Sequence, residues 1–448
     1  MNNLKVGFCR MNIDPPMGVP INGYYKERFV EGILDSLYMN VLALQSGDNT
    51  ILLINVDNCG LTQAKIAVFK EIITERTGVS AENIMISATH THTAPDIDPF
   101  SDNEIIKAYT ELVKTRFADA SSYAIADLKD AKMGYGKGVA PNIAFGRRYL
   151  MKDGSTKTNP GVNNPDIVKP IGVVDDSVNV IRFDREGADT IVFVNFANHP
   201  DVVGGSKVSA DWPGLLRTTV EKVLDNTKCI FFNGAQGDVN HVNVHPKPGD
   251  LNGMFMDFDD VSRGYAHAEY IARVVTGGVL QAYDKVNYVD VDSLVNVQKP
   301  MYIPSNRPDP KDIPEAHRIN DLHNAGKDDE IPYEGMMLTT VVAEAARMVF
   351  LENGPDTLDM TLTGIAIGPV AIVGIPGEPF TGIGLALKDT EGFDMILPCC
   401  ASNGYEGYFP MQDSYDEGGY EARSSRFKAG VAEFIIKEGK ALLESLRK

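Results

Sequence analysis

The sequence predicts an α/β protein, a single large domain over residues 1–448 in which mixed β-sheets are flanked by helices. The first observation is that runs of branched and apolar residues alternate with stretches whose apolar residues recur at helical spacing. The second is that no convincing internal repeat and no clear linker divides the chain. A third is the composition, 43% hydrophobic and 23% charged, which is that of a soluble globular protein with a large core.

The first elements are strands followed by a helix. LKVGF near the start, 38–46 and 50–57 are rich in branched and apolar residues and predict strands. Residues 61–80 have apolar positions at helical spacing, and this helix is expected to stop at Gly78.

The next strand is predicted at NIMISAT, residues 83–89, and it completes a β-α-β unit. His90 and His92 stand where this strand ends. The strand ends of α/β proteins are where binding groups tend to lie.

The same order recurs in the middle of the chain. Residues 188–200 predict a strand that runs into a loop, and 209–226 predict a helix with Pro213 near its first turn. Residues 228–240 are again a strand followed by a glycine-containing loop.

The last third repeats the strand-into-loop pattern at 366–378. Before it, 298–335 are polar and proline-rich, which predicts a surface excursion or a lid. The chain closes at 430–448 with an amphipathic helix that carries cations in its last turn.

The charge excludes some classes of partner. With 42 basic and 61 acidic residues the net charge is −19, so binding to nucleic acid or to anionic membranes is not expected. No run approaches the roughly 20 apolar residues that span a bilayer, so no stable membrane insertion is expected. The oligomeric state is left open.

The five cysteines predict a fold that does not depend on disulfides. They show no CxxC spacing, and the only close pair is the vicinal Cys399 and Cys400, which rarely forms a relaxed bridge. Because the N-terminus also shows no signal peptide, a cytoplasmic protein is expected, or a secreted one if a leader has been trimmed.

Four strand-to-loop junctions carry side chains of the metal-ligand type: 90–92, 198–200, 238–240 and 377–379. Zinc favours imidazole nitrogen and carboxylate oxygen, and a catalytic zinc keeps one position open for water. Residues two apart in a strand share a face, which predicts that both histidines of the first junction point into one cavity.

Each motif has an ordinary structural reading beside the functional one. Two histidines at a strand end can be packing, an Asn-His-Pro stretch is mostly turn chemistry, and Glu378 can be a helix cap. Tyr405 and Tyr408 in a later aromatic cluster are commonly core residues. The pattern alone leaves a metal site and ordinary packing both open.

Six motifs in order resemble the catalytic domain of the neutral/alkaline, non-lysosomal ceramidases. The family's D-I-T-G-P turn with its G-Y element, T-H-T-H-S-G-P, H-P-T, G-D-V-S-P-N, P-G-E with T-x-x-G, and N-x-Y-x-x-Y with R-Y-E-A-x-S are matched here. The matching stretches are NIDPPMGVPINGY (12–24), THTHTAP (89–95), NHPD (198–201), GDVNHVN (237–243), PGEPFTGIG (376–384), and NGYEGYFP (403–410) with GYEARSS (419–425).

The resemblance implies a ceramidase-like catalytic domain and a single Zn²⁺ site. The zinc ligands carried over by motif are His90, His199, Glu378 and Tyr408. His92 would lie beside the metal and carry protons, Tyr420 would be a further active-site tyrosine, and Arg147, preferred over Arg148, would polarise the scissile carbonyl.

Departures from the family pattern bear on the mechanism and substrate. Asn240 stands where the family has serine, and its amide cannot be a nucleophile, though it can orient water or donate to an oxyanion. No C-terminal immunoglobulin-like domain is expected, since the chain ends soon after 419–425. His241 and His245 are expected to be surface groups or neighbours of a ligand.

The expected function is zinc-dependent hydrolysis of an amide in a small N-acyl substrate by metal-activated water, with ceramide only one possible substrate. Two alternatives stay open: a metal-dependent esterase or lactonase that uses the same water, and a binding protein that keeps the pocket without catalysis.

Overall fold

The computed structural model describes residues 3–247 and 264–447. Its two largest sheets are both mixed. The larger has the strand order β14-β12-β11-β6-β1-β3-β4-β5, with β16 paired to β6, and the second has the order β17-β18-β19-β21. The strands are β1 (Leu4–Asn12), β3 (Tyr38–Ser46), β4 (Asn49–Val56), β5 (Ile84–Ala88), β6 (Lys129–Val139), β11 (Ser177–Arg185), β12 (Thr190–Phe196), β14 (Thr227–Asn233), β16 (Asn287–Val289), β17 (Leu294–Pro304), β18 (Thr357–Ile367), β19 (Val370–Gly374) and β21 (Met395–Cys399).

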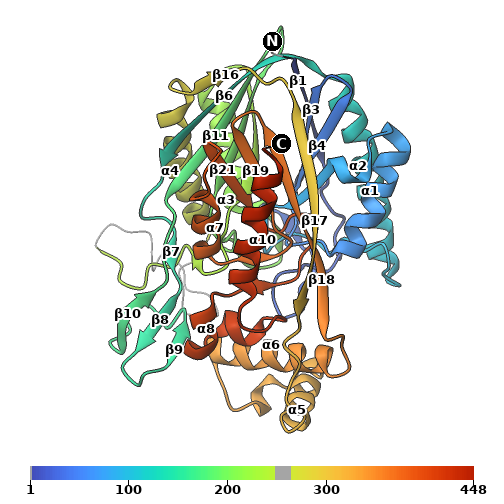
Figure 1. Ribbon diagram of the computed structural model, residues 1–448. Helices are drawn as coiled ribbons and strands as arrows, with labels where there is room; N and C mark the ends of the chain where they lie inside the picture. Colours follow the sequence, from blue (N-terminus) through green and yellow to red (C-terminus); the bar gives the residue numbers. More distant parts are fainter. Residues whose placement is uncertain (1–2, 248–263, 448) are drawn as a thin grey trace.

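The two sheets pack face to face and helices cover their outer faces, so the molecule has four layers (Figure 1). Four helices pack on the large sheet and two on the second. They are α1 (Gln63–Thr77), α2 (Glu104–Ala126), α3 (Asp211–Val223) and α4 (Tyr265–Tyr283), then α7 (Thr381–Lys388) and α10 (Val431–Ser445). The predicted α/β class with mixed sheets flanked by helices is confirmed.

The middle of strand β3, residues 41–44, is apolar at every position because both of its faces are buried. Successive side chains of a strand point to opposite faces of the sheet. Val41 and Ala43 pack against the helices of the outer layer, whereas Leu42 and Leu44 pack between the two sheets. A strand buried on both faces therefore appears as a continuous apolar run, without the polar alternation of a surface strand.

The architecture contains three units of one topology, although the sequence shows no repeat. Each unit is an antiparallel hairpin, a helix, and a strand that pairs in parallel with the second hairpin strand. The first unit is β3, β4, α1 and β5, the second is β11, β12, α3 and β14, and the third is β18, β19, α7 and β21.

The last strands of the three units meet at their carboxyl ends. The amide of Cys400 donates to the carbonyl of Asn233 over 2.9 Å, and the amide of Ala88 donates to the carbonyl of Ala401 over 3.1 Å. The Ser87 hydroxyl donates to the Cys400 carbonyl over 3.0 Å. The loops that follow β5, β14 and β21 are thereby fixed against one another.

Most of the other described elements are short. The short strands are β2 (Gly32–Ile33), β7 (Phe145–Gly146), β8 (Arg148–Met151), β9 (Thr156–Thr158), β10 (Ile167–Ile171), β13 (Lys207–Val208), β15 (Val239–Asn240), β20 (Glu378–Pro379) and β22 (Tyr408–Phe409). The short helices are η1 (Ala81–Asn83), η2 (Asp328–Glu330), α8 (Gln412–Glu417) and α9 (Tyr420–Ser424).

The proline-rich segment 298–335 forms regular structure over much of its length. Its first residues belong to β17, which pairs with β18 as far as Pro304. The helices α5 (Ile313–Asn324) and α6 (Gly335–Leu351) then pack on each other at one end of the molecule (Figure 1). Its role as a lid stays a prediction.

All five cysteines are free thiols, and four of them are buried. Within residues 3–247 and 264–447, no helix combines the length and apolar character needed to cross a membrane.

A buried ion pair joins the first unit to the second. Arg217 on α3 donates to both carboxylate oxygens of Asp57, which follows β4, over 2.9 and 2.5 Å, and both side chains are buried. We expect Arg217→Met to lower the free energy of unfolding by about 3–5 kcal/mol, because a buried carboxylate would lose its countercharge. The shift in the urea unfolding midpoint measures this.

Lys107→Met is the matched control, since Lys107 pairs with Glu104 on the exposed face of α2 over 3.0 Å. Loss of that pair should cost no more than about 0.5 kcal/mol. Equal small losses in both variants would contradict the role assigned to the buried pair.

Candidate metal centre

Three side chains of the metal-ligand type converge where the three units meet. His90 follows β5 of the first unit, His199 follows β12 of the second, and Glu378 opens β20 shortly after β19 of the third. All three side chains are buried, with exposed fractions of 0 to 1%. Each unit therefore supplies one of the three groups.

The three groups form a nearly equilateral triangle. His90 Nε2 lies 3.3 Å from His199 Nε2, and each of these nitrogens lies 3.3 Å from Glu378 Oε2. With zinc–ligand distances of about 2.0–2.1 Å, two ligand atoms of a tetrahedron lie about 3.3–3.4 Å apart. The spacing and the donor set fit one face of a tetrahedral zinc site.

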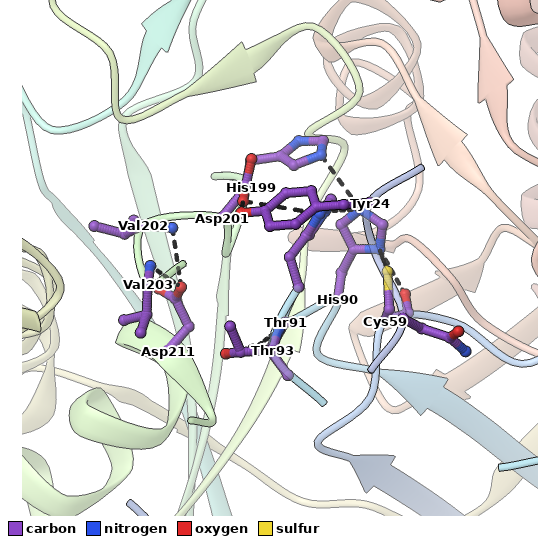
Figure 2. Close-up of polar contacts among 12 residues, drawn as sticks. Tyr24, Cys59, His90, Thr91, Thr93, His199, Asp201, Val202, Val203 and Asp211 are labelled. Atoms are coloured by element: carbon purple, nitrogen blue, oxygen red, sulfur yellow. Dashed lines mark hydrogen bonds and ion pairs between the residues drawn. The ribbon is translucent and has the colours of Figure 1, made fainter. Parts of the chain in front are cut away.

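The second nitrogen of each imidazole faces a backbone carbonyl, an arrangement typical of metal-binding histidines. His90 Nδ1 lies 2.6 Å from the carbonyl oxygen of Cys59 (Figure 2). His199 Nδ1 lies 3.2 Å from the carbonyl oxygen of Gln236. Protonated at Nδ1, both rings direct an Nε2 lone pair at the centre of the triangle. His90 holds this position with a left-handed backbone, φ 73°.

The charges at the triangle are set by burial and by one another. Burial opposes ionisation of Glu378, but His90 outweighs it, together with the Tyr405 hydroxyl, and holds the carboxyl pKa at about 2. Burial, Arg147 and His90 keep the pKa of His199 well below its usual range. Glu378 and His199 are thus in the states that bind a metal, an ionised carboxylate and a neutral imidazole. Burial opposes protonation of His90, but Glu378 outweighs it and raises the pKa of His90 well above its usual range, so metal binding would release a proton from His90.

His92 lies next to the triangle. Its Nε2 is 3.3 Å from His90 Nε2, and the two rings meet edge to face with centroids 4.9 Å apart. The expectation that the two histidines point the same way because they lie two apart in a strand was wrong. Strand β5 ends at Ala88, so both histidines lie in the loop that follows it. The rings approach each other where the backbone turns through the left-handed conformation of His90, and not along a strand.

Two groups of side chains near His90 could hold a metal ion. His90, His199 and Glu378 have ligand atoms within 4.8 Å of one another, and a second such group joins His90 and His92 to Cys59. His90 belongs to both groups, and the predicted division, with His90 on the metal and His92 beside it, stays a prediction.

Two tyrosines approach Glu378 from different directions. Tyr408 pairs with Glu378 in the β20–β22 ladder, and its ring lies 5.5 Å from that of Tyr420. The Tyr405 hydroxyl donates to Glu378 Oε1 over 2.6 Å. The sequence motif missed this hydroxyl contact, and Tyr408 as a zinc ligand stays a prediction.

Arg147 lies in the wall of the adjoining cavity, and Arg148 points elsewhere. Arg147 Nε is 2.6 Å from Glu421 Oε1, and its guanidinium lies 5.3 Å from the centre of the Tyr408 ring. Arg148 instead donates to the Ser414 hydroxyl over 2.8 Å. Of the two arginines in the motif, the structure brings Arg147 to the site.

The cavity has a volume of about 580 Å³ and opens beside the triangle. Its lining combines apolar, aromatic and charged side chains. They include Tyr24, His92, Arg147, His199, Asp201 and Tyr420. Such a volume and mixture suit a small organic molecule with a polar group.

Asn240 is buried and is not among the residues that line the cavity, and its role in catalysis stays a prediction. Its Nδ2 donates to Asn159 Oδ1 over 3.1 Å, and Asn159 lines the cavity. Asn240, which stands at the serine position of the family motif, therefore holds Asn159 at the cavity.

His241 and His245 stand apart from the triangle. The buried ring of His241 lies 5.2 Å from that of His267, and His245 is exposed. Among the described residues, neither belongs to a metal-ligand group.

Three residues near the ligands went unnoticed in the sequence. Gln236 and Asp201 lie in the GAQGD and NHPD stretches, beside residues singled out for other reasons. Gln236 Nε2 donates to Glu378 Oε2 over 3.3 Å, and Asp201 faces His92. Cys59 could not be found from the sequence, because it accepts the hydrogen bond from His90 through its backbone carbonyl, which every residue type has.

No model of a protein family matches the chain, and no curated protein matches its sequence. Among solved structures it is similar to the neutral ceramidase from Pseudomonas aeruginosa, with 17% identity and a TM-score of 0.74 over 100% of this chain and 75% of that one. A ceramidase complexed with C2 matches with 15% identity and a TM-score of 0.69, over 100% and 76% of the two chains. The likeness shows that this chain has the neutral ceramidase fold.

Proposed function

We propose that this chain, which has the neutral ceramidase fold, is a zinc-dependent hydrolase that cleaves the amide bond of a small N-acyl substrate. The observation that carries the proposal is the buried triangle of His90, His199 and Glu378 with edges of 3.3 Å, beside a cavity of about 580 Å³. The similarity to ceramidase structures supports hydrolysis of an amide over other reactions at such a site.

The proposed ligands are the three residues of the triangle and, as the fourth, Tyr408. Two observations support Tyr408 as the fourth ligand: it lines the cavity, and it is the ladder partner of Glu378. Zinc held there supplies a Lewis acid for the substrate carbonyl and a water of lowered pKa, about 7.

Arg147 and Tyr420 are proposed to orient the substrate carbonyl. Both line the cavity, and Arg147 is held by Glu421 and by the carbonyl of Gly237 over 2.8 Å. A guanidinium fixed in this way and a phenol hydroxyl are donors that can stabilise negative charge on the carbonyl oxygen. Asn240 supports this wall through Asn159.

His92 is proposed to carry the proton from the attacking water to the leaving amine. Its imidazole lines the cavity and lies against His90. Imidazole titrates near neutral pH, which suits it to accept and then donate a proton. Because an amide occupies position 240, no serine nucleophile is available there.

The test measures metal content, stability and hydrolysis on one preparation. We expect one zinc per chain, loss of hydrolysis on chelation, and recovery on adding Zn²⁺. At a free zinc concentration a hundred times the dissociation constant, the folded state should gain about 2.7 kcal/mol, seen as a higher melting temperature.

The substrate panel includes ceramide, other N-acyl lipids, N-acylated amino sugars and matched esters. Faster cleavage of amides than of the matched esters is expected. A protein without stoichiometric metal that is inert toward the whole panel would instead be the binding protein without catalysis.

A further inference from the structure

A carboxylate and a tyrosine stand on the side of His92 that faces away from His90. Asp201 Oδ1 lies 3.8 Å from His92 Nδ1, and the Tyr24 hydroxyl donates to the same oxygen (Figure 2). All three residues line the cavity. The side chains of His92 and Asp201 are 11% and 17% exposed, so both are largely shielded from water.

The backbone and Arg28 fix this arrangement. The amide of His92 donates to the carbonyl of Pro200 over 3.2 Å, which places the side chains of His92 and Asp201 on adjoining segments. Arg28 donates to the carbonyl of His92 over 2.8 Å, and its guanidinium lies 4.0 Å from the centre of the Tyr24 ring. One arginine thus holds both the histidine segment and the tyrosine.

We propose that Asp201 is the positioning residue of His92, with Tyr24 as the donor that orients the carboxylate. A proton held at Nδ1 by Asp201 leaves the Nε2 lone pair facing the triangle, where it can accept a proton. This rests on the proposed function of His92. The distance of 3.8 Å exceeds that of a hydrogen bond by about 1 Å, and such contacts commonly tighten when substrate binds.

The carboxylate of Asp201 distinguishes this chain from the ceramidase motif. The H-P-T element of the ceramidase motif is His199-Pro200-Asp201 here, so an anionic group replaces a hydroxyl. A carboxylate attracts an N–H more strongly than a hydroxyl does, and it stabilises the charged imidazolium that proton transfer creates. Proton transfer through His92 therefore depends on Asp201 in this protein.

The first experiment reads the His92 tautomer by nitrogen NMR of ¹⁵N-histidine-labelled protein, with and without Zn²⁺. The His92 signals are assigned by their loss in His92→Ala. Wild type should carry the proton at Nδ1, and Asp201→Asn should move the population toward the Nε2–H form. An unchanged tautomer in Asp201→Asn overturns the proposal, whether or not any substrate is hydrolysed.

The second experiment measures kinetics on the best amide of the panel. Asp201→Asn should lower kcat by about 10- to 100-fold with little change in KM or zinc content, and Asp201→Glu should recover part of the loss. In a His92→Ala background the same substitution should change kcat less than about twofold, because the two residues act as one unit. An equal loss in both backgrounds would show a merely structural role.

Tyr24→Phe and Asp166→Asn complete the set. Tyr24→Phe removes the hydroxyl that donates to Asp201 but keeps the ring beneath Arg28. We expect it to lower kcat less than Asp201→Asn does, again with little change in KM. Asp166 is 67% exposed and paired with Lys152 at the surface, so Asp166→Asn should leave tautomer and kcat unchanged. No hydrolysis by wild type would contradict the proposed function, and the tautomer would still decide the role of Asp201.

Discussion

Replacing Glu378 by glutamine is expected to abolish stoichiometric zinc binding and to lower amide hydrolysis by at least about a thousandfold, equivalent to about 4 kcal/mol. The substitution keeps the shape but removes the one negative charge of the triangle, whose Oε2 lies 3.3 Å from both imidazoles. Zinc per chain by atomic spectroscopy and kcat/KM on the same sample measure both effects. His90→Ala should give the same loss of metal.

Tyr405→Phe is the matched control for Glu378→Gln. It deletes only the hydroxyl on Oε1, 2.6 Å away, and leaves Oε2 and both histidines in place. We expect zinc to bind about 10- to 100-fold more weakly, and to saturate at higher concentration. Full zinc occupancy in both Glu378→Gln and His90→Ala would refute the ligand assignment.

Replacing His92 by alanine is expected to leave zinc in place and to lower kcat by about a hundredfold or more. His92 lies outside the triangle but within 3.3 Å of His90, so it can exchange protons at the site without holding the metal. The ratio of zinc to protein and the single-turnover rate are the two measurements. Added imidazole should restore part of the rate by occupying the space left by the ring.

His245→Ala serves as the control for the loss of a histidine, since His245 is exposed and stands apart from the triangle. It should retain both zinc and activity. If His92→Ala lost its metal, His92 would be a ligand, and the roles given to the two histidines would have to be exchanged.

The elements of the fold could be predicted because local periodicity marks them. The helix expected at 61–80 is α1, and the strand expected at 228–240 begins as β14. The three related units could not be found from local periodicity. Apolar side chains can replace one another in buried strands, so units of the same topology need not share a sequence pattern. Their topology is a property of strand pairing over long range, which a single sequence does not display.

The site could be predicted to the level of motifs but not of individual contacts. Tyr405 and Tyr408 lie three residues apart, and only the register of β20 with β22 decides which of them pairs with Glu378. Arg147 and Arg148 are likewise adjacent, and the chain turns one to the cavity and the other to Ser414. Which of two neighbouring side chains reaches the site depends on the direction of the backbone in a loop, and residue type alone does not fix that direction.

The meeting of the three units also bears on the order of folding. His90 and His199 are separated by 109 residues, and Glu378 follows β19 of the second sheet and opens the short strand β20. Contacts between such distant segments form only after their loops have closed, at a large cost in chain entropy. A nascent chain that has completed one unit carries a single histidine or carboxylate of the triangle, so the triangle is complete only after all three units have folded.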